Sequence, residues 1–272
     1  MRRACGPPAI ARDITPTPPA IQQDLPLADP VPLVAPLAPA AITRLWFCVW
    51  LPRLPLESVA GEHAGAATAI VEEQHGIHRI FLVDDEARAA GVQPGQAANA
   101  ALALLPALQL EERSLPREQQ ALEGLATWLE RFSSFVSIAD QDVLLLEIAG
   151  SLRLFGGLRE LRQKISRGLR GLGFTGALAI APTPLAATWL ARAGRRACIQ
   201  DETNLASALR KLPLACMDWP ASLCETLAGM GVMTIGDCLR LPREGFTRRF
   251  GAEYLLQLDR ALGHLPDPRN SW

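Results

Sequence analysis

Short apolar runs alternate with amphipathic segments through the middle of the chain. The runs predict buried strands at 45–51, 69–73, 79–84, 143–148 and 174–181. Apolar residues at 3/4 spacing, or small-residue segments, predict helices between these strands at 55–64, 97–105, 116–132, 158–172 and 184–193. This alternation predicts an α/β (α+β) fold in which helices pack on a mixed sheet.

The two ends of the chain have different patterns. Residues 1–43 hold 10 of the 22 prolines and show no helical or strand periodicity, so we expect a disordered, extended tail. After residue 200 the strand pattern stops, and Gly and Pro separate short helices predicted at 203–211, 220–228, 234–240, 243–250 and 252–262. The sequence therefore predicts a small all-α domain over 201–272.

The charges are unevenly distributed along a chain whose formal net charge is −1. Residues 44–150 carry 7 Lys/Arg and 15 Asp/Glu, whereas residues 151–200 carry 9 and 1. A sign change between adjacent segments indicates one basic face, which is either a binding surface or an ordinary solvated helix surface. We expect the helix over 158–172 to present a solvated or partner-binding face rather than a DNA contact.

Composition narrows the class of protein further. The six cysteines contain no C-x-x-C pair, which favours reduced packing residues over metal ligands. No apolar run reaches the roughly 20 residues that a membrane helix needs. We therefore expect a cytoplasmic protein without a cofactor or metal.

Four segments carry motifs, in a fixed order. They lie at 79–95, 136–157, 176–191 and 227–239. They resemble Y-family (lesion-bypass) DNA polymerases, whose motifs are the fingers signature Y-E-A-R-x-x-G-V, the palm strand S-[IL]-D-E-A-Y-L-D, the palm segment G-I-A-P-N-K-L-L-A-K and a thumb hairpin ending in G-D-L. The resemblance covers about 44–268. It implies a palm over 44–200 with fingers inserted at about 52–115, and a helix-hairpin-helix thumb over 201–272. From this resemblance we expect a truncated product that lacks a little finger and has weakened DNA affinity.

The residues at the polymerase site depart from this pattern. The alignment places Trp50 and Val143 where the family has metal-binding carboxylates, and only Asp142 keeps its acid. Mg²⁺ needs oxygen ligands, so we expect these positions to be vestigial and the chain to be catalytically inactive. In the nucleotide-contacting motif Y-E-A-R, the Arg is present here as Arg88, but the position of the Tyr holds Asp85. The family's two lysines in the second palm segment fall on Pro184 and Thr188.

Two patterns, L-P-x-L-P-L-E at 51–57 and G-S-x-x-L-F-G-G at 150–157, resemble the ImuB-type branch of the family. That resemblance implies an accessory factor of translesion synthesis, DNA repair and damage-induced mutagenesis. It also implies three protein partners: a sliding clamp, an error-prone C-family polymerase and a RecA-like accessory protein.

Two further segments are candidate binding sites. The glycine-rich hairpin with Gly229 and Gly231 can present backbone N–H groups to a DNA phosphate, and nearby cations can add charge. These cations are Arg240, Arg243, Arg248 and Arg249. An ordinary helix–helix connection is the alternative. Residues 22–27 resemble a clamp-binding peptide through Gln22, Leu25 and Leu27, although Leu and Pro are common in this tail and chance also explains the match.

Two other functions stay open. The chain is an active error-prone Y-family polymerase if the ligands are misaligned, in which case Glu57 is the sole acidic candidate from the first strand region to join Asp142. It is a remnant or a protein-interaction module if it binds neither DNA nor a replication protein. The accessory-factor and active-polymerase hypotheses predict weak, non-specific DNA binding and a nucleoid-associated location. The remnant or interaction-module hypothesis does not.

Overall fold

In the computed structural model the structure describes residues 44–59, 65–195 and 197–272, which form one compact unit. The predicted tail over 1–43 lies outside the described residues.

A four-stranded antiparallel sheet lies at the centre of this unit, in the order β5-β6-β1-β7. Its two inner strands are the most apolar runs of the sequence, as expected for strands that are covered on both faces. Phe47, Cys48 and Val49 of β1 have no exposed surface. The strand bounds are β1 Trp46–Trp50, β5 Val136–Asp140, β6 Val143–Glu147 and β7 Ala177–Ala181.

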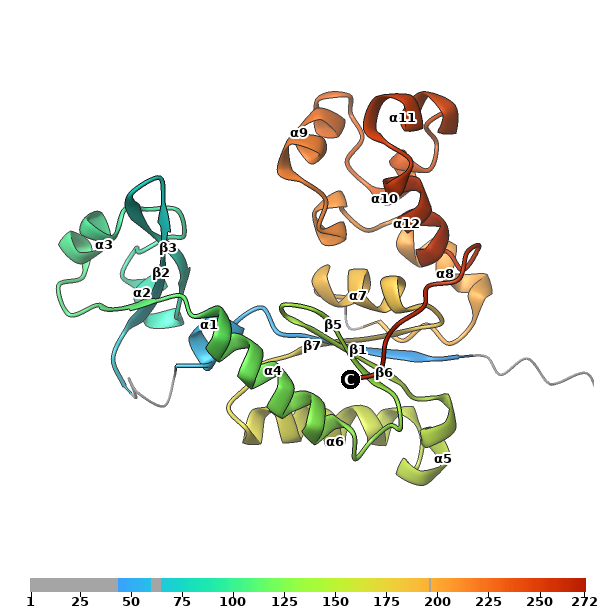
Figure 1. Cartoon of the computed structure of the whole chain (residues 1–272), viewed down its shortest axis with the longest axis horizontal. Helices are drawn as coiled ribbons and strands as arrows, with labels where there is room; N and C mark the ends of the chain where they lie inside the picture. Colours follow the sequence, from blue (N-terminus) through green and yellow to red (C-terminus); the bar gives the residue numbers. More distant parts are fainter. Residues whose placement is uncertain (1–43, 60–64, 196) are drawn as a thin grey trace, which may run out of the picture. The chain divides into compact units, whose positions relative to one another are not determined.

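Alternate side chains of the sheet enter two separate cores, because successive residues of a strand point to opposite faces. Phe47 and Leu144 pack with helices α4 (Leu115–Leu129) and α6 (Leu158–Gly171) on one face. Cys48 and Val143 pack with α7 (Pro184–Arg192) on the other face. Figure 1 shows α4 and α6 below the sheet and α7 above it.

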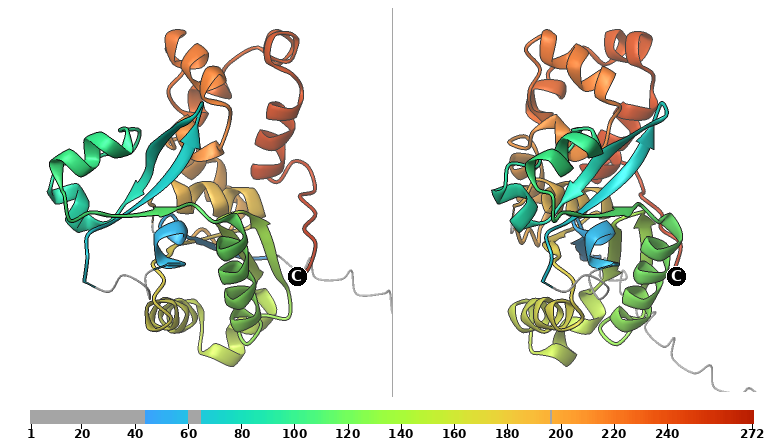
Figure 2. Two further views of the ribbon diagram at one scale, coloured as in Figure 1. Left: turned by 60° about the vertical axis from the view of Figure 1, so that its left-hand side comes forward. Right: turned by 90° about the vertical axis from the view of Figure 1, so that its left-hand side faces the viewer.

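A second, three-stranded sheet in the order β3-β2-β4 is inserted between β1 and α4, and it has a core of its own. Strand β2 pairs antiparallel with β3 and parallel with β4. His75 and Gly76 both have positive φ, which suits the tight turn of the β2–β3 hairpin. The hairpin is seen best in Figure 2. The bounds are α1 Leu54–Glu57, β2 Thr68–Gln74, β3 Ile77–Val83, α2 Asp85–Ala89, α3 Ala98–Leu104 and β4 Gln109–Glu112.

Only helices follow α7 in the described chain. Their apolar side chains, including Leu227, Phe246 and Leu258, join the core that covers α7 and one face of the sheet. The helices are α8 Glu202–Leu209, η2 Leu214–Met217, α9 Ala221–Gly229, α10 Ile235–Cys238, α11 Arg243–Phe250 and α12 Glu253–Ala261. The α/β fold class and the all-α C-terminal part are thereby confirmed.

Some boundaries differ from the expectation. The helix expected at 55–64 ends at Glu57 within the described residues, and the one expected to reach residue 132 ends at Leu129. Strands β4 and β5, helices α2 and α5 (Leu152–Phe155) and the 3-10 turn η1 (Ala149–Ser151) were not expected. These elements are short or partly polar, so their contacts with other elements, rather than an apolar pattern in their own sequence, define them. No helix in the described ranges has the length and apolar character needed to cross a membrane.

Candidate functional site

The end of β1 and the turn between β5 and β6 bring together the three positions that were predicted to be vestigial. Trp50 pairs directly with Val143 across the β1–β6 ladder. Asp142 immediately precedes Val143, and its carbonyl oxygen accepts a hydrogen bond of 2.9 Å from the Leu51 amide. Two adjacent strands therefore place Trp50, Asp142 and Val143 side by side.

The Asp142 carboxylate is held by protein groups on both oxygens. Trp50 donates its indole N–H to Oδ2 at 2.7 Å, and Arg192 donates to Oδ1 at 3.2 Å. Arg192 is the last residue of α7, and its guanidinium also reaches Asp140 at 2.8 Å and Asp218 at 3.4 Å. The largely buried Arg192 guanidinium thus contacts carboxylates from the β5–β6 turn and from the segment after η2.

The environment keeps Arg192 charged. Burial acts to lower the pKa of Arg192, but the hydrogen bond to Asp140 and the charges of Asp142 and Asp218 outweigh it and raise the pKa. The sequence gives no direct indication of this residue, because it belongs to no motif. The sequence offered only an arginine at the end of a small-residue helix that follows a predicted strand.

These residues do not fit a magnesium site. Val143 is fully buried and apolar, and the indole N–H of Trp50 is a donor without a lone pair for a metal. The Asp142 oxygens already face Trp50 and Arg192. Within 44–59, 65–195 and 197–272, no three His, Cys, Asp or Glu side chains gather in a way that could hold a metal ion.

Glu57 is engaged elsewhere. Its Oε1 accepts a hydrogen bond of 3.0 Å from the Thr175 amide. It lines a cavity of about 440 Å³, whereas Asp140, Asp142 and Arg192 line a different one of about 190 Å³. The active-polymerase alternative, which needs Glu57 beside Asp142, gains no support from this arrangement.

The positions expected at a nucleotide site are scattered. Arg88 is exposed on α2. Asp85 pairs with Arg53 at 2.9 Å, and this hydrogen bond lowers the pKa of Asp85. Pro184 is buried in the first turn of α7, and the Thr188 hydroxyl donates to its carbonyl at 3.0 Å. Neither of these two positions offers a cation for phosphate.

The hairpin between α9 and α10 uses its amides internally. Gly231, at φ 80°, donates to Ala228 at 2.9 Å. Thr234 and Asp237 form a capping box at α10, in which Asp237 accepts from the amides of Met233 and Thr234 at 3.1 and 2.9 Å. The hydrogen bond from the Thr234 hydroxyl lowers the pKa of Asp237. A phosphate at this hairpin would therefore meet a carboxylate, and the contact predicted through Gly229 and Gly231 stays a prediction.

The four candidate arginines fall into two groups. Arg240 pairs with Asp237, and Arg243 binds Asp259 through both terminal nitrogens at 3.0 and 2.5 Å. In the part of the chain that the structure describes, Arg248 and Arg249 have no carboxylate partner; Arg249 contacts the sulfur of Met230 at 3.6 Å.

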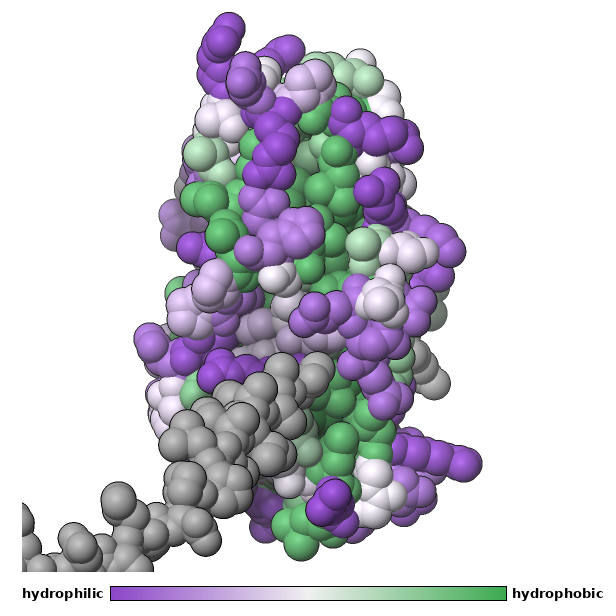
Figure 3. All heavy atoms as spheres, turned by 90° about the vertical axis from the view of Figure 1, so that its right-hand side faces the viewer, coloured by the Kyte–Doolittle hydropathy of each residue, from purple (hydrophilic) through white to green (hydrophobic). Residues whose placement is uncertain are grey.

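Arg243 and Arg248 line a groove between α11 and α12, together with Leu255 and Leu256. The upper part of Figure 3, over the C-terminal helices, shows apolar side chains flanked by polar ones. Arg248 and Arg249 are therefore the arginines of this set with the most charge left for a phosphate. The clamp-peptide residues Gln22, Leu25 and Leu27 lie outside the described residues.

Solved structures share this fold. DinB from Sulfolobus solfataricus matches with a TM-score of 0.65 at 17% identity, over 84% of this chain and 69% of that one. An insertion ternary complex of Dbh DNA polymerase matches with a TM-score of 0.67 at 17% identity, over 83% and 69%. The fold is therefore that of the Y-family DNA polymerases.

The sequence comparisons narrow the class. Residues 61–192 match the model of the impB/mucB/samB family. Protein ImuB of Caulobacter vibrioides is 36% identical over 173 residues, which is 64% of this chain and 38% of that protein. The chain thus spans well under half the length of this curated relative. The resemblance expected from the four motifs is confirmed.

Proposed function

We propose that this chain is a non-catalytic Y-family polymerase homologue that acts as an accessory or scaffold protein in translesion synthesis, DNA repair and damage-induced mutagenesis. One observation carries the proposal: Asp142 is bound by the Trp50 indole at 2.7 Å and by Arg192 at 3.2 Å. Phosphoryl transfer by two metal ions needs carboxylates that are free to coordinate them. A carboxylate held in this way serves structure instead.

The proposal includes a division into domains. Residues 44–200 correspond to a palm with fingers at about 52–115, and residues 201–272 to a thumb. The separate cores of the two sheets and the run of C-terminal helices support this division. The full accessory role, with a sliding clamp, a C-family polymerase and a RecA-like protein as partners, is taken from the ImuB-type resemblance.

Weak, non-specific DNA binding is part of the proposal. Arg248 and Arg249 carry charge without a carboxylate partner in the described chain, whereas Arg243 is neutralised by Asp259. Phosphate contacts of this kind do not depend on base sequence and weaken as salt rises.

Fluorescence anisotropy with a labelled primer–template, over a series of salt concentrations, tests this binding. Replacing Arg248 and Arg249 by alanine should weaken binding at every salt concentration and lower the log–log salt slope by about 0.9 for each phosphate that is no longer neutralised. The matched control replaces Arg153 and Arg159, which are exposed near and on α6, and removes the same charge. Equal losses in both variants would mean that net charge, not this surface, binds DNA. No binding by the parent chain would favour a pure protein-binding role.

A further inference from the structure

Strand β7 is an edge strand of the central sheet, and only part of its edge is covered. At Ile180 the segment after α7 closes the edge: Ile180 donates to Ala197 at 3.1 Å and accepts from Ile199 at 2.9 Å. Backbone groups of an antiparallel strand alternate in direction, so Leu178 and Gly176 face the same way as Ile180. The edge at Gly176–Leu178 faces a cavity instead of another strand.

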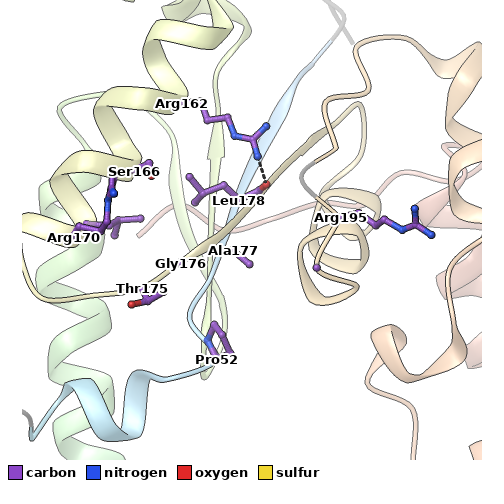
Figure 4. A pocket seen from close by; sticks show the side chains of 11 residues that line it. Pro52, Arg162, Ser166, Arg170, Thr175, Gly176, Ala177, Leu178 and Arg195 are labelled. Atoms are coloured by element: carbon purple, nitrogen blue, oxygen red, sulfur yellow. Dashed lines mark hydrogen bonds between the residues drawn. The ribbon is translucent and has the colours of Figure 1, made fainter. Parts of the chain in front are cut away.

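This cavity has a volume of about 690 Å³ and lies between α6 and β7. Leu169, Leu178 and Pro52 supply apolar walls. Arg162 reaches across from α6 and donates to the Leu178 carbonyl at 3.2 Å, as the dashed line in Figure 4 shows. Ser166 and Arg170 lie along the same helix beside it (Figure 4).

The cavity is basic in a chain of net charge −1. Three arginines and no carboxylate line it. The guanidinium of one of them, Arg195, points away from Leu178 in Figure 4, so the charge at the strand edge comes from Arg162 and Arg170 on α6. The Arg170 side chain donates to the Ser166 carbonyl at 3.3 Å and has no carboxylate partner among the described residues.

We infer that the Gly176–Leu178 edge and the α6 arginines form a docking groove for an extended, acidic peptide segment of a partner protein. The peptide backbone pairs with the Leu178 amide and with the backbone groups of Gly176, Arg162 keeps its hydrogen bond to the Leu178 carbonyl, and the peptide's carboxylates face Arg170. An exposed strand edge beside a shallow cavity is a recurring peptide-binding arrangement, in which main-chain hydrogen bonds give affinity and side-chain pockets give specificity. The inference is independent of whether the chain extends a primer.

A peptide fits this groove better than a nucleic acid does. The strand edge repeats donors and acceptors at the spacing of a polypeptide backbone. The apolar walls from Leu169 and Leu178 suit side chains, and no aromatic residue lines the cavity for base stacking. Two of the three lining arginines, Arg162 and Arg170, lie on the wall formed by α6.

The test uses the full chain and a fluorescein-labelled peptide in which valine alternates with glutamate, followed by anisotropy. Three other probes are compared: the same peptide with lysine for glutamate, the acidic peptide N-methylated on alternate residues, and a single-stranded oligonucleotide of equal charge. Arg170→Glu is compared with Arg167→Glu, which makes the same charge change on an exposed α6 residue that does not line the cavity.

The acidic peptide should bind, and Arg170→Glu should weaken it about tenfold or more, because one charge-assisted contact becomes a repulsion. Arg167→Glu should change affinity much less, and N-methylation or lysine should abolish binding. Equal binding of the N-methylated peptide would overturn strand pairing. Equal losses in both protein variants would overturn the site, as would an absence of binding. Tighter binding of the oligonucleotide that depends on Arg170 would assign the groove to nucleic acid.

Discussion

At the scale of single residues, the central question is how a carboxylate is stabilised where the family holds metal ions. Asp142 receives one neutral donor and one cation from the protein itself, and Arg192 extends the contact to Asp140 and Asp218. The guanidinium therefore supplies positive charge at this place in the fold. It also links α7, the β5–β6 turn and the segment after η2.

The Trp50–Asp142 hydrogen bond should contribute measurably to stability. In a double-mutant cycle, Trp50→Phe and Asp142→Ala should each destabilise the fold and show a coupling of about 1 kcal/mol, because the bond joins an N–H to a charged acceptor that is partly exposed. Urea unfolding of the four proteins gives the coupling. A coupling indistinguishable from zero would mean that the two residues are neighbours without a stabilising bond.

Glu57 should make stability depend on pH. Burial raises the pKa of Glu57 above its ordinary value of 4.5. Ionisation therefore costs folding free energy as pH rises through the raised value, and costs nothing below 4.5, where both folded and unfolded chains are protonated. Glu57→Gln keeps an acceptor for Thr175 without the charge. Its stability relative to the parent should increase as pH rises from acid to neutral; a difference that is constant with pH would contradict this.

At the scale of elements, the sequence pattern predicted the strands whose side chains are buried. The apolar runs at 45–51 and 143–148 became the inner strands β1 and β6, and their pairing put Trp50 opposite Val143. Strand β5 was missed because its residues Ser137 and Asp140 break the apolar pattern, and pairing with β6 holds it instead. Arg192 was missed because its role depends on three-dimensional contacts with Asp140 and Asp218. The hairpin amides were expected to be free because a Gly-rich sequence does not reveal a capping box.

The capping box should stabilise the α9–α10 hairpin. Thr234→Ala removes the side-chain acceptor for the Asp237 amide and should cost about 1 kcal/mol, as loss of an N-cap does in other helices. Thermal unfolding measures the loss. The control is Thr226→Ala, whose exposed hydroxyl only donates to the Ser222 carbonyl on the preceding turn. A loss of equal size in the control would show that the hydroxyl at 234 has no special role.

At the scale of the whole molecule, the fold was predictable and the function only partly so. The order of four motifs identified the Y-family fold, and the structural comparisons confirm it. The chain covers 38% of Protein ImuB, so partners that depend on the rest of such a protein stay proposals. Clusters of arginines in the sequence predicted DNA contacts less well, because ion pairs decide which arginines can bind a phosphate. Arg243 is paired with Asp259, whereas Arg248 has no carboxylate partner in the described residues.

Primer extension tests the central claim most directly. The purified chain is incubated with primer–template, the four nucleotides and Mg²⁺ or Mn²⁺, beside Asp142→Ala and an active Y-family polymerase. We expect no extension by the chain in either metal, because Trp50 and Arg192 hold Asp142 and Val143 offers no ligand. Extension by the parent chain that Asp142→Ala abolishes would show that the chain is a polymerase and that this residue is part of a working metal site.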